Sequence, residues 1–168
     1  MSRRVVVWLI PVLLTLHNAE EALTFGAYRP KFIASLPARP AAVGARVSHP
    51  TFVATVAILS ALVFALAWAV DGRPRSVILL WLLLTVEVAI GLNGIAHLVS
   101  ALFIVHGYTP GLVTGVVVNV PFATYCVVRA QRERWLGPTA LRTTLPAAIV
   151  LHGPVLIAAL WLATRLGR

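Results

Sequence analysis

Long apolar runs separated by polar links are the main feature of this 168-residue chain. Five of these runs come close to, or exceed, the ~20 residues that a helix needs to cross the hydrocarbon core of a bilayer. The runs comprise residues 5–25, 51–70, 77–104, 111–129 and 144–164. The pattern therefore predicts an all-α fold, a polytopic bundle of about five transmembrane helices.

The longest polar link before the last run, residues 26–50, contains Pro30, Pro37, Pro40 and Pro50. Proline removes a backbone donor and disfavours helix at the preceding residue, so these prolines argue against a long regular helix here. We expect an interfacial or re-entrant segment, with room for a short helix near residues 31–36. Since no polar stretch is long enough to fold separately, residues 1–168 are predicted to form a single transmembrane helical domain.

The first run also has features of a secretory signal peptide, because Arg3 and Arg4 precede the apolar residues 5–16. No good cleavage site of small residues follows promptly, and the run continues into His17 and two glutamates. A retained helix is therefore predicted.

Composition supports the membrane interpretation. The chain is 60% hydrophobic and 11% charged, whereas soluble domains are about 45–50% apolar and about 25% charged. The mean hydropathy is +0.91. We therefore expect an integral membrane protein whose main partner is the lipid bilayer.

The charged residues of the chain indicate its partners and its orientation in the membrane. The net charge of +9 would suggest nucleic acid in a soluble protein. Here the arginines flank the apolar runs, as expected for contacts with lipid headgroups, so no nucleic-acid partner is predicted. Slightly more basic residues fall on the side of the N-terminus, which predicts a multi-pass protein with a cytoplasmic N-terminus. Lys31 is the one lysine among the 14 basic residues, a composition typical of GC-rich bacterial genomes, so we expect the bacterial plasma membrane.

Ionisable residues interrupt the first run at His17-Asn18-Ala19-Glu20-Glu21. A charged side chain inside hydrocarbon costs about 2.5 kcal/mol or more, so something must offset this cluster. Positions i, i+3 and i+4 share one face of a helix, which places His17, Glu20 and Glu21 together. One imidazole and two carboxylates in a small volume suit a metal ion or a proton relay.

A second polar pair lies late in the third run, where Asn93 and His97 are four residues apart and therefore on one helix face. The first and third helices run in the same direction, so both motifs fall in the same half of the bundle. The turn at Tyr108-Thr-Pro-Gly111 lies on that side as well, and its tyrosine could close over the cluster. We expect His17, Glu20 or Glu21, and His97 to share one site.

Three further polar residues lie within the later runs. His152 precedes Gly153-Pro154. Its position fits a packing role and a role as a ligand equally well. Asn119 is near mid-depth in the fourth run. Glu87 lies roughly 80–120° around the third helix from the Asn93 and His97 pair, so it is expected near the site but not facing it.

Three motifs occur in order along the chain: His17-x-x-Glu20-Glu21, Asn93-x-x-x-His97 and Tyr108-x-Pro110-Gly111. In this respect the chain resembles the HXXEE family of small bacterial integral membrane proteins. The resemblance covers residues 17–111 and leaves His152 outside. It implies a membrane fold and supports the choice of residues, and it names no reaction.

The leading hypothesis is an intramembrane metal-dependent enzyme that acts on a hydrophobic or lipid-like substrate. The candidate ligands for a divalent Zn or Fe ion are His17, Glu20, Glu21, His97 and His152, since imidazole and carboxylate suit these metals. The candidate catalytic residues are Glu20, Glu21, Asn93 and Tyr108, with Glu21 as base or further ligand. Two alternatives stay open: a small proton-coupled transporter or channel component, and a structural or accessory membrane protein whose polar cluster orders the bundle.

Overall fold

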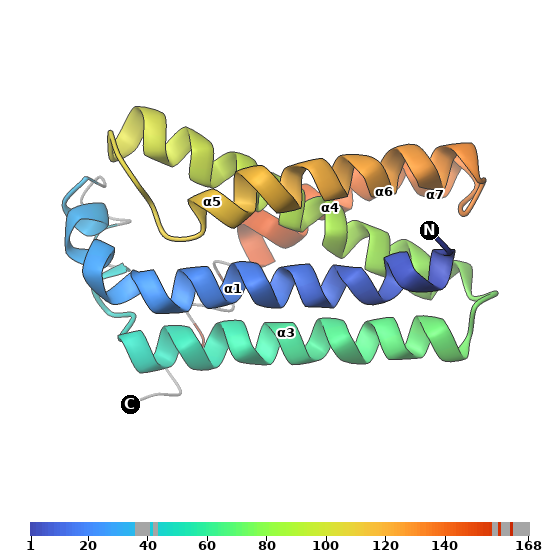
Figure 1. Cartoon of the computed structure of the whole chain (residues 1–168), viewed down its shortest axis with the longest axis horizontal. Helices are drawn as coiled ribbons and strands as arrows, with labels where there is room; N and C mark the ends of the chain where they lie inside the picture. The colour runs from blue at the N-terminus through green and yellow to red at the C-terminus, as the bar shows by residue number, and fades with distance from the viewer. Residues whose placement is uncertain (36–40, 42–43, 156–157, 159–161, 163–168) are drawn as a thin grey trace.

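The chain is built from helices, and no strand occurs in residues 1–35, 41, 44–155, 158 and 162, the part that the computed structural model describes. Figure 1 shows the elements in order along the chain. Their bounds are α1 Arg3–Ala34, α3 His49–Gly72, α4 Val77–Val99, η1 Ser100–Ile104, α5 Leu112–Thr114, η2 Gly115–Asn119, α6 Val120–Arg132, α7 Pro138–Val150 and η3 Leu151–Val155, where η marks a π-helical turn. The predicted all-α fold is confirmed.

Four helices are long and apolar enough to cross a membrane, which is compatible with a multi-pass membrane protein. They cover Arg3–Ala34, His49–Gly72, Val77–Ile104 and Leu112–Arg132, and each contains or closely matches one of the first four predicted spans. The fifth predicted span, residues 144–164, is helical through Val155. Most of the rest of that span lies outside the described residues.

The first helix is longer than its apolar run predicts, because α1 continues past residue 25 to Ala34 with Pro30 inside it. Contacts made by the extra turns account for the difference: Arg29 Nη2 donates a hydrogen bond of 2.8 Å to the carbonyl of Ala45, and the rings of Tyr28 and Tyr108 lie 4.6 Å apart. Figure 1 shows the ribbon of α1 bending near its C-terminal end, as proline in a helix interior commonly causes. Residues 36–40, in the predicted proline-rich segment, lie outside the described residues.

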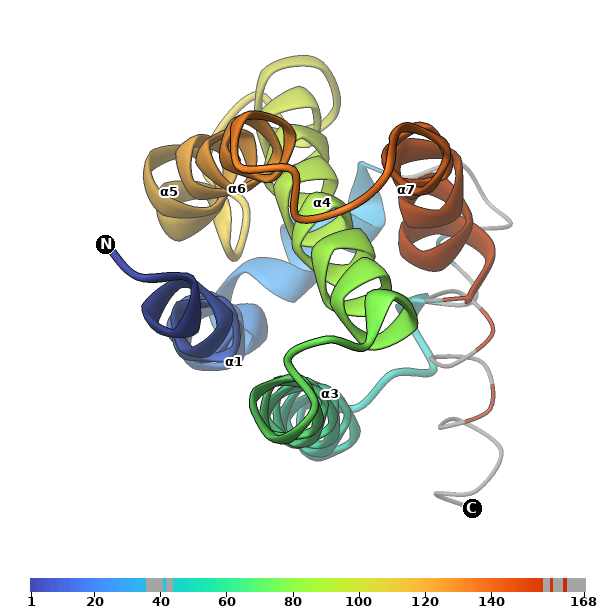
Figure 2. The ribbon, with the colours of Figure 1, turned by 90° about the vertical axis from the view of Figure 1, so that its right-hand side faces the viewer.

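Helix α4 runs through the middle of the bundle, and Figure 2 shows α1 and α3 below it, α5 and α6 to its upper left, and α7 to its right. Helices α1 and α3 are joined by Asn18, whose amide donates to the carbonyl of Val56 at 3.1 Å and to Ser60 Oγ at 2.8 Å. A continuous apolar core fills the space between α1, α4 and α6; among its fully buried members are Val6, Leu83, Cys126 and Ala130. This arrangement holds the middle of α1 beside the C-terminal half of α4.

The C-terminal half of α4 packs unusually close to the helix that follows it. A Cβ atom built on Gly94 would lie 2.5 Å from the carbonyl oxygen of Gly115 and 2.9 Å from a methyl group of Val120. Paired small residues allow such backbone contact between membrane helices. Gly94 and Gly115 therefore set the distance between α4 and η2.

We expect Gly94→Ala to lower the stability of the protein by about 1–3 kcal/mol, because the added methyl group meets backbone that cannot move aside without separating the helices. Thermal unfolding of the detergent-purified protein measures this effect. Gly26→Ala is the matched control, since a Cβ there meets nothing within 4 Å and alanine favours helix. Equal melting temperatures for the two variants would contradict the close-contact argument.

Candidate metal site

The HXXEE motif lies near the middle of α1, where two of its side chains share a helix face. His17 and Glu21 are one turn apart, and His17 Nε2 lies 3.7 Å from Glu21 Oε1. The His17 side chain is 1% exposed and that of Glu21 is 13% exposed. The pair is therefore enclosed at the histidine and reachable at the carboxylate.

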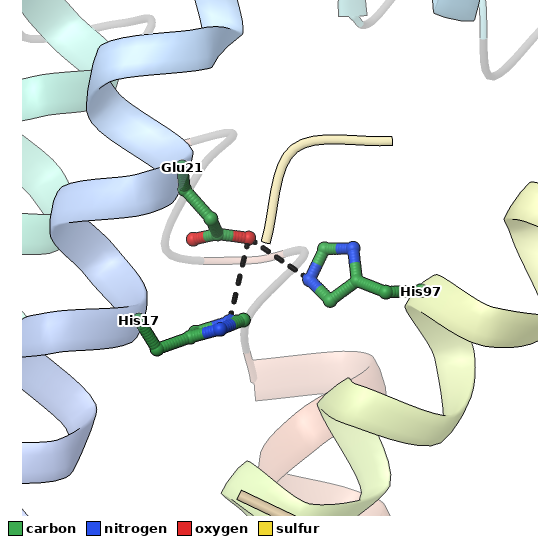
Figure 3. Close-up of side chains that lie close together, drawn as sticks. All are labelled: His17, Glu21 and His97. Atoms are coloured by element: carbon green, nitrogen blue, oxygen red, sulfur yellow. Dashed lines mark ion pairs between the residues drawn. The ribbon is translucent and has the colours of Figure 1, made fainter. Parts of the chain in front are cut away.

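His97 of α4 reaches this pair from the opposite side. Its Nε2 atom lies 3.0 Å from Glu21 Oε1, and the two imidazole centroids are 5.3 Å apart. Figure 3 shows Glu21 between the two rings, with both contacts marked. One ligand atom from each of His17, Glu21 and His97 lies within 4.8 Å of the other two, so this group could hold a metal ion.

The spacing of these atoms suits such an ion. Zinc binds histidine nitrogen and carboxylate oxygen at about 2.0–2.2 Å, which puts neighbouring ligand atoms roughly 3.0–3.5 Å apart in tetrahedral or octahedral geometry. The two measured separations, 3.0 and 3.7 Å, bracket this range. These two separations are therefore compatible with a shared ion.

Asn93, one turn before His97 on α4, adds an amide to the same volume. Its Nδ2 atom lies 2.9 Å from His17 Nε2 and 3.1 Å from His97 Nε2. The two amide hydrogens can each meet one imidazole lone pair. Glu21 Oε1 brings a third electron-rich atom to this space. A cation held by all three atoms would take the place of the amide hydrogens at the two imidazole lone pairs.

The turn before α5 closes the site. Figure 1 shows the segment that leads into α5 turning back toward the middle of the molecule. It ends at Gly111, whose φ of +81° is left-handed. A Cβ on Gly111 would lie 2.7 Å from His17 Cε1, 2.8 Å from Glu21 Cγ and 3.0 Å from His97 Nε2. The missing side chain of Gly111 therefore leaves a small cradle bounded by all three members of the group.

Glu20 points to a different set of partners from Glu21. Its carboxylate accepts hydrogen bonds from Tyr108 Oη at 2.6 Å, from the amides of Val113 and Thr114 at 3.1 and 2.7 Å, and from Thr114 Oγ1 at 2.6 Å. The motif predicts Glu20 as a ligand, whereas the structure places it outside the three-residue group, against the N-terminus of α5. A carboxylate is favourable there, because the first amides of a helix lack partners.

Tyr108 contacts the motif through Glu20. Burial raises the pKa of the Tyr108 phenol, and the hydrogen bond to Glu20 raises it further. The phenol therefore keeps its proton, and its O–H donates a hydrogen bond to the carboxylate of Glu20. This bond fastens the turn to α1.

Comparison with known families matches the family described as "Protein of unknown function with HXXEE motif" to residues 8–126. The chain belongs to the HXXEE family. The matched residues include His17, Glu21 and His97, and also the Gly111 turn. Searches of curated proteins and of solved structures each found no match.

Two predicted residues lie apart from the HXXEE group. His152, beyond the residues matched to the HXXEE family, lies outside the group. Glu87 is 1% exposed and is not one of the three residues of the group. Its Oε1 atom and both side-chain polar atoms of Asn119 have no hydrogen-bond partner among the described residues.

Sequence reasoning missed Thr114, which contacts both Glu20 and His17. A threonine in an apolar run carries no pattern that sets it apart from a packing residue. Its position three residues after Gly111 becomes informative only when the turn is known to begin a helix, since the third helical residue presents its amide to a capping group. The partner that would identify it is 94 residues away along the chain.

Proposed function

We propose that this protein is an intramembrane metal-dependent enzyme that acts on a hydrophobic or lipid-like substrate, with a Zn or Fe ion held by His17, Glu21 and His97. The observation that carries the proposal is the convergence of two imidazoles and one carboxylate, within 4.8 Å of one another, between two helices that are long and apolar enough to cross a membrane.

The number of ligands favours catalysis over a structural metal. Structural zinc sites are closed by four protein ligands, whereas catalytic sites keep a position open for water or substrate. Two histidines and one carboxylate are also the ligands of many non-haem iron oxygenases. A bound ion would supply Lewis acidity and an activated water or oxygen. The chain's own groups would hold the ion, and the Asn93 amide would orient a polar group of the substrate.

The surroundings of the group favour a hydrophobic substrate. Glu21 and His97 provide the partly exposed side of the site. Their neighbours along the chain are large exposed apolar side chains, with Leu23 84% exposed on α1 and Leu98 38% exposed on α4. The helices that carry the site therefore present apolar side chains to their surroundings, which suits a lipid-like compound better than a soluble polar one.

One observation favours the transporter alternative. Glu87 and Asn119 are both 1% exposed and have polar atoms without partners among the described residues. Buried ionisable groups of this kind occur in proton pathways of membrane transporters. A proton-coupled transporter needs no bound metal, so metal content separates the two proposals, and it separates the enzyme from a purely structural protein as well.

The decisive measurement is elemental analysis of the detergent-purified full chain. We expect roughly one Zn or Fe per chain, and loss of the ion in His17→Ala and in His97→Ala, because each variant leaves only two of the three protein ligands. His49→Ala is the control, since His49 bonds to the carbonyl of Ala22 and lies outside the group. A folded wild type without metal, or full metal content in both ligand variants, would refute the enzyme proposal.

A further inference from the structure

The hydroxyl of Thr114 lies between the two halves of the HXXEE motif. Thr114 Oγ1 is 2.6 Å from Glu20 Oε2 and 2.9 Å from His17 Nδ1. Three side chains thus form a line from the carboxylate, through the hydroxyl, to the imidazole. The far nitrogen of that imidazole, Nε2, is the atom that faces Glu21 and Asn93.

Counting hydrogens fixes the direction of both bonds. A hydroxyl has one hydrogen to donate, and an ionised carboxylate has none. Thr114 therefore donates its hydrogen to Glu20, and its oxygen accepts from His17. The donor at His17 has to be Nδ1–H, so in the neutral ring Nε2 carries the lone pair.

The environment of Glu20 keeps it an acceptor. Its two oxygens receive four hydrogen bonds from Tyr108, Val113 and Thr114, two of them from backbone amides at the N-terminus of α5. Amides and the positive end of a helix favour the charged carboxylate. A protonated Glu20 does not fit this arrangement, because its O–H group would face a group that is itself a hydrogen-bond donor.

We infer that Glu20, acting through Thr114, is a positioning residue that fixes the proton of His17 on Nδ1 and so directs the Nε2 lone pair into the metal group. The inference rests on the proposed function, because the position of this proton matters for metal binding: a histidine binds metal through an unprotonated nitrogen. Metal-binding histidines commonly donate their second nitrogen to a carboxylate, a carbonyl or water, which sets the tautomer. Here a threonine hydroxyl is inserted between the imidazole and the carboxylate.

This role also explains the two glutamates of the motif. Glu21 contributes an oxygen to the group directly, whereas Glu20 reaches it only through Thr114. A purely structural Glu20, which merely fastens α5 to α1, would leave the Asn93 amide at Nε2, and not the Thr114 hydroxyl at Nδ1, to set the tautomer of His17. The tautomer is therefore the property to measure.

The test uses nitrogen NMR of the detergent-solubilised full chain, metal-free and labelled with ¹⁵N at histidine, with His17 identified by its absence in His17→Ala. Above the titration range of the ring, we expect His17 of the wild type to be protonated at Nδ1. Thr114→Val has nearly the same shape but cannot accept a hydrogen bond, so it should shift the proton toward Nε2. Thr114→Ser restores the hydroxyl and should restore the wild-type spectrum.

Zinc affinity gives a second readout on the same samples. We expect Thr114→Val to weaken zinc binding about 10–100-fold, the range for loss of an outer hydrogen-bond partner, and Thr114→Ser to bind nearly as well as wild type. A wild-type His17 protonated at Nε2 overturns the inference without any variant, and so does a Thr114→Val spectrum that matches wild type. If the tautomer responds as expected while the wild type binds no zinc, the positioning role stands and the proposed function fails.

Discussion

Replacing Glu21 with glutamine should lower zinc affinity by at least about 100-fold, more than the loss of an outer hydrogen-bond partner, while leaving the metal-free protein folded. The Glu21 oxygen lies 3.0 Å from His97 Nε2 and 3.7 Å from His17 Nε2, and it supplies the only formal negative charge of the group. A neutral amide oxygen of the same size keeps the packing and removes the charge. Competition with a chromogenic chelator measures the affinity.

Thermal unfolding adds an independent measure of the Glu21 variant. Metal that binds only the folded state raises stability by about 2.7 kcal/mol when its free concentration is 100 times Kd. We expect the wild type to show such a shift on addition of zinc, and Glu21→Gln to show almost none at the same concentration.

Glu20→Gln is the matched control, one position along the same helix. Its carboxylate faces four donors, and glutamine would turn one acceptor oxygen into an amide that confronts them. We expect it to destabilise the metal-free protein by about 1–3 kcal/mol, the cost of leaving a buried donor unsatisfied. Its loss of affinity should resemble that of Thr114→Val. If Glu20→Gln lost metal completely while Glu21→Gln kept it, the roles assigned to the two glutamates would be reversed.

Gly111→Ala should have the largest effect on the fold and the site together. The left-handed backbone at this residue, with φ at +81°, costs about 1–3 kcal/mol for a residue with a side chain. The added methyl group would also lie 2.7 Å from His17 and 2.8 Å from Glu21, which overpacking penalises by about another 1–3 kcal/mol. We expect a strongly lowered melting temperature and no measurable zinc binding.

Gly107→Ala tests whether this effect belongs to Gly111 or to the turn in general. Gly107 lies in the same turn, its φ is not left-handed, and a Cβ there would meet only the end of the flexible Lys31 side chain at 3.0 Å. We expect it to retain zinc binding and to melt within a few degrees of wild type. Should Gly111→Ala behave in the same way, the cradle under the three side chains has no role in metal binding.

The fold was predictable from the sequence where hydrophobic burial alone decides it. The third run, residues 77–104, coincides with α4 and η1, since apolar length is the dominant constraint on a membrane-length helix. The end of α1 was not predictable, because Pro30 disfavours a helix locally and only contacts such as Arg29 with Ala45 stabilise it. Propensity fails where distant residues supply the stabilising energy.

The candidate site was partly predictable for the same reason. Helical phase places His17 and Glu21 on one face, and the spacing of Asn93 and His97 does so on α4. The different roles of Glu20 and Glu21 could not be predicted from helical phase, because both side chains lie within reach of that helix face. The role of Glu20 depends on the path of the turn at residues 105–111, because this turn brings Thr114 and Tyr108 to Glu20.

The tertiary partners of the polar residues at the HXXEE motif of α1 come later in the chain, and this order has a consequence for biosynthesis. Asn18 forms a hydrogen bond with α3, and Glu21 contacts His97 of α4. Glu20 accepts a hydrogen bond from Thr114. At the usual rate of translation the ribosome adds the 94 residues from Glu20 to Thr114 in roughly 5–20 s. In a membrane, α1 would enter with the Glu20 carboxylate uncompensated for that time. Its stable insertion therefore depends on helices not yet made, so truncation before Thr114 should leave α1 prone to slip back out of the bilayer.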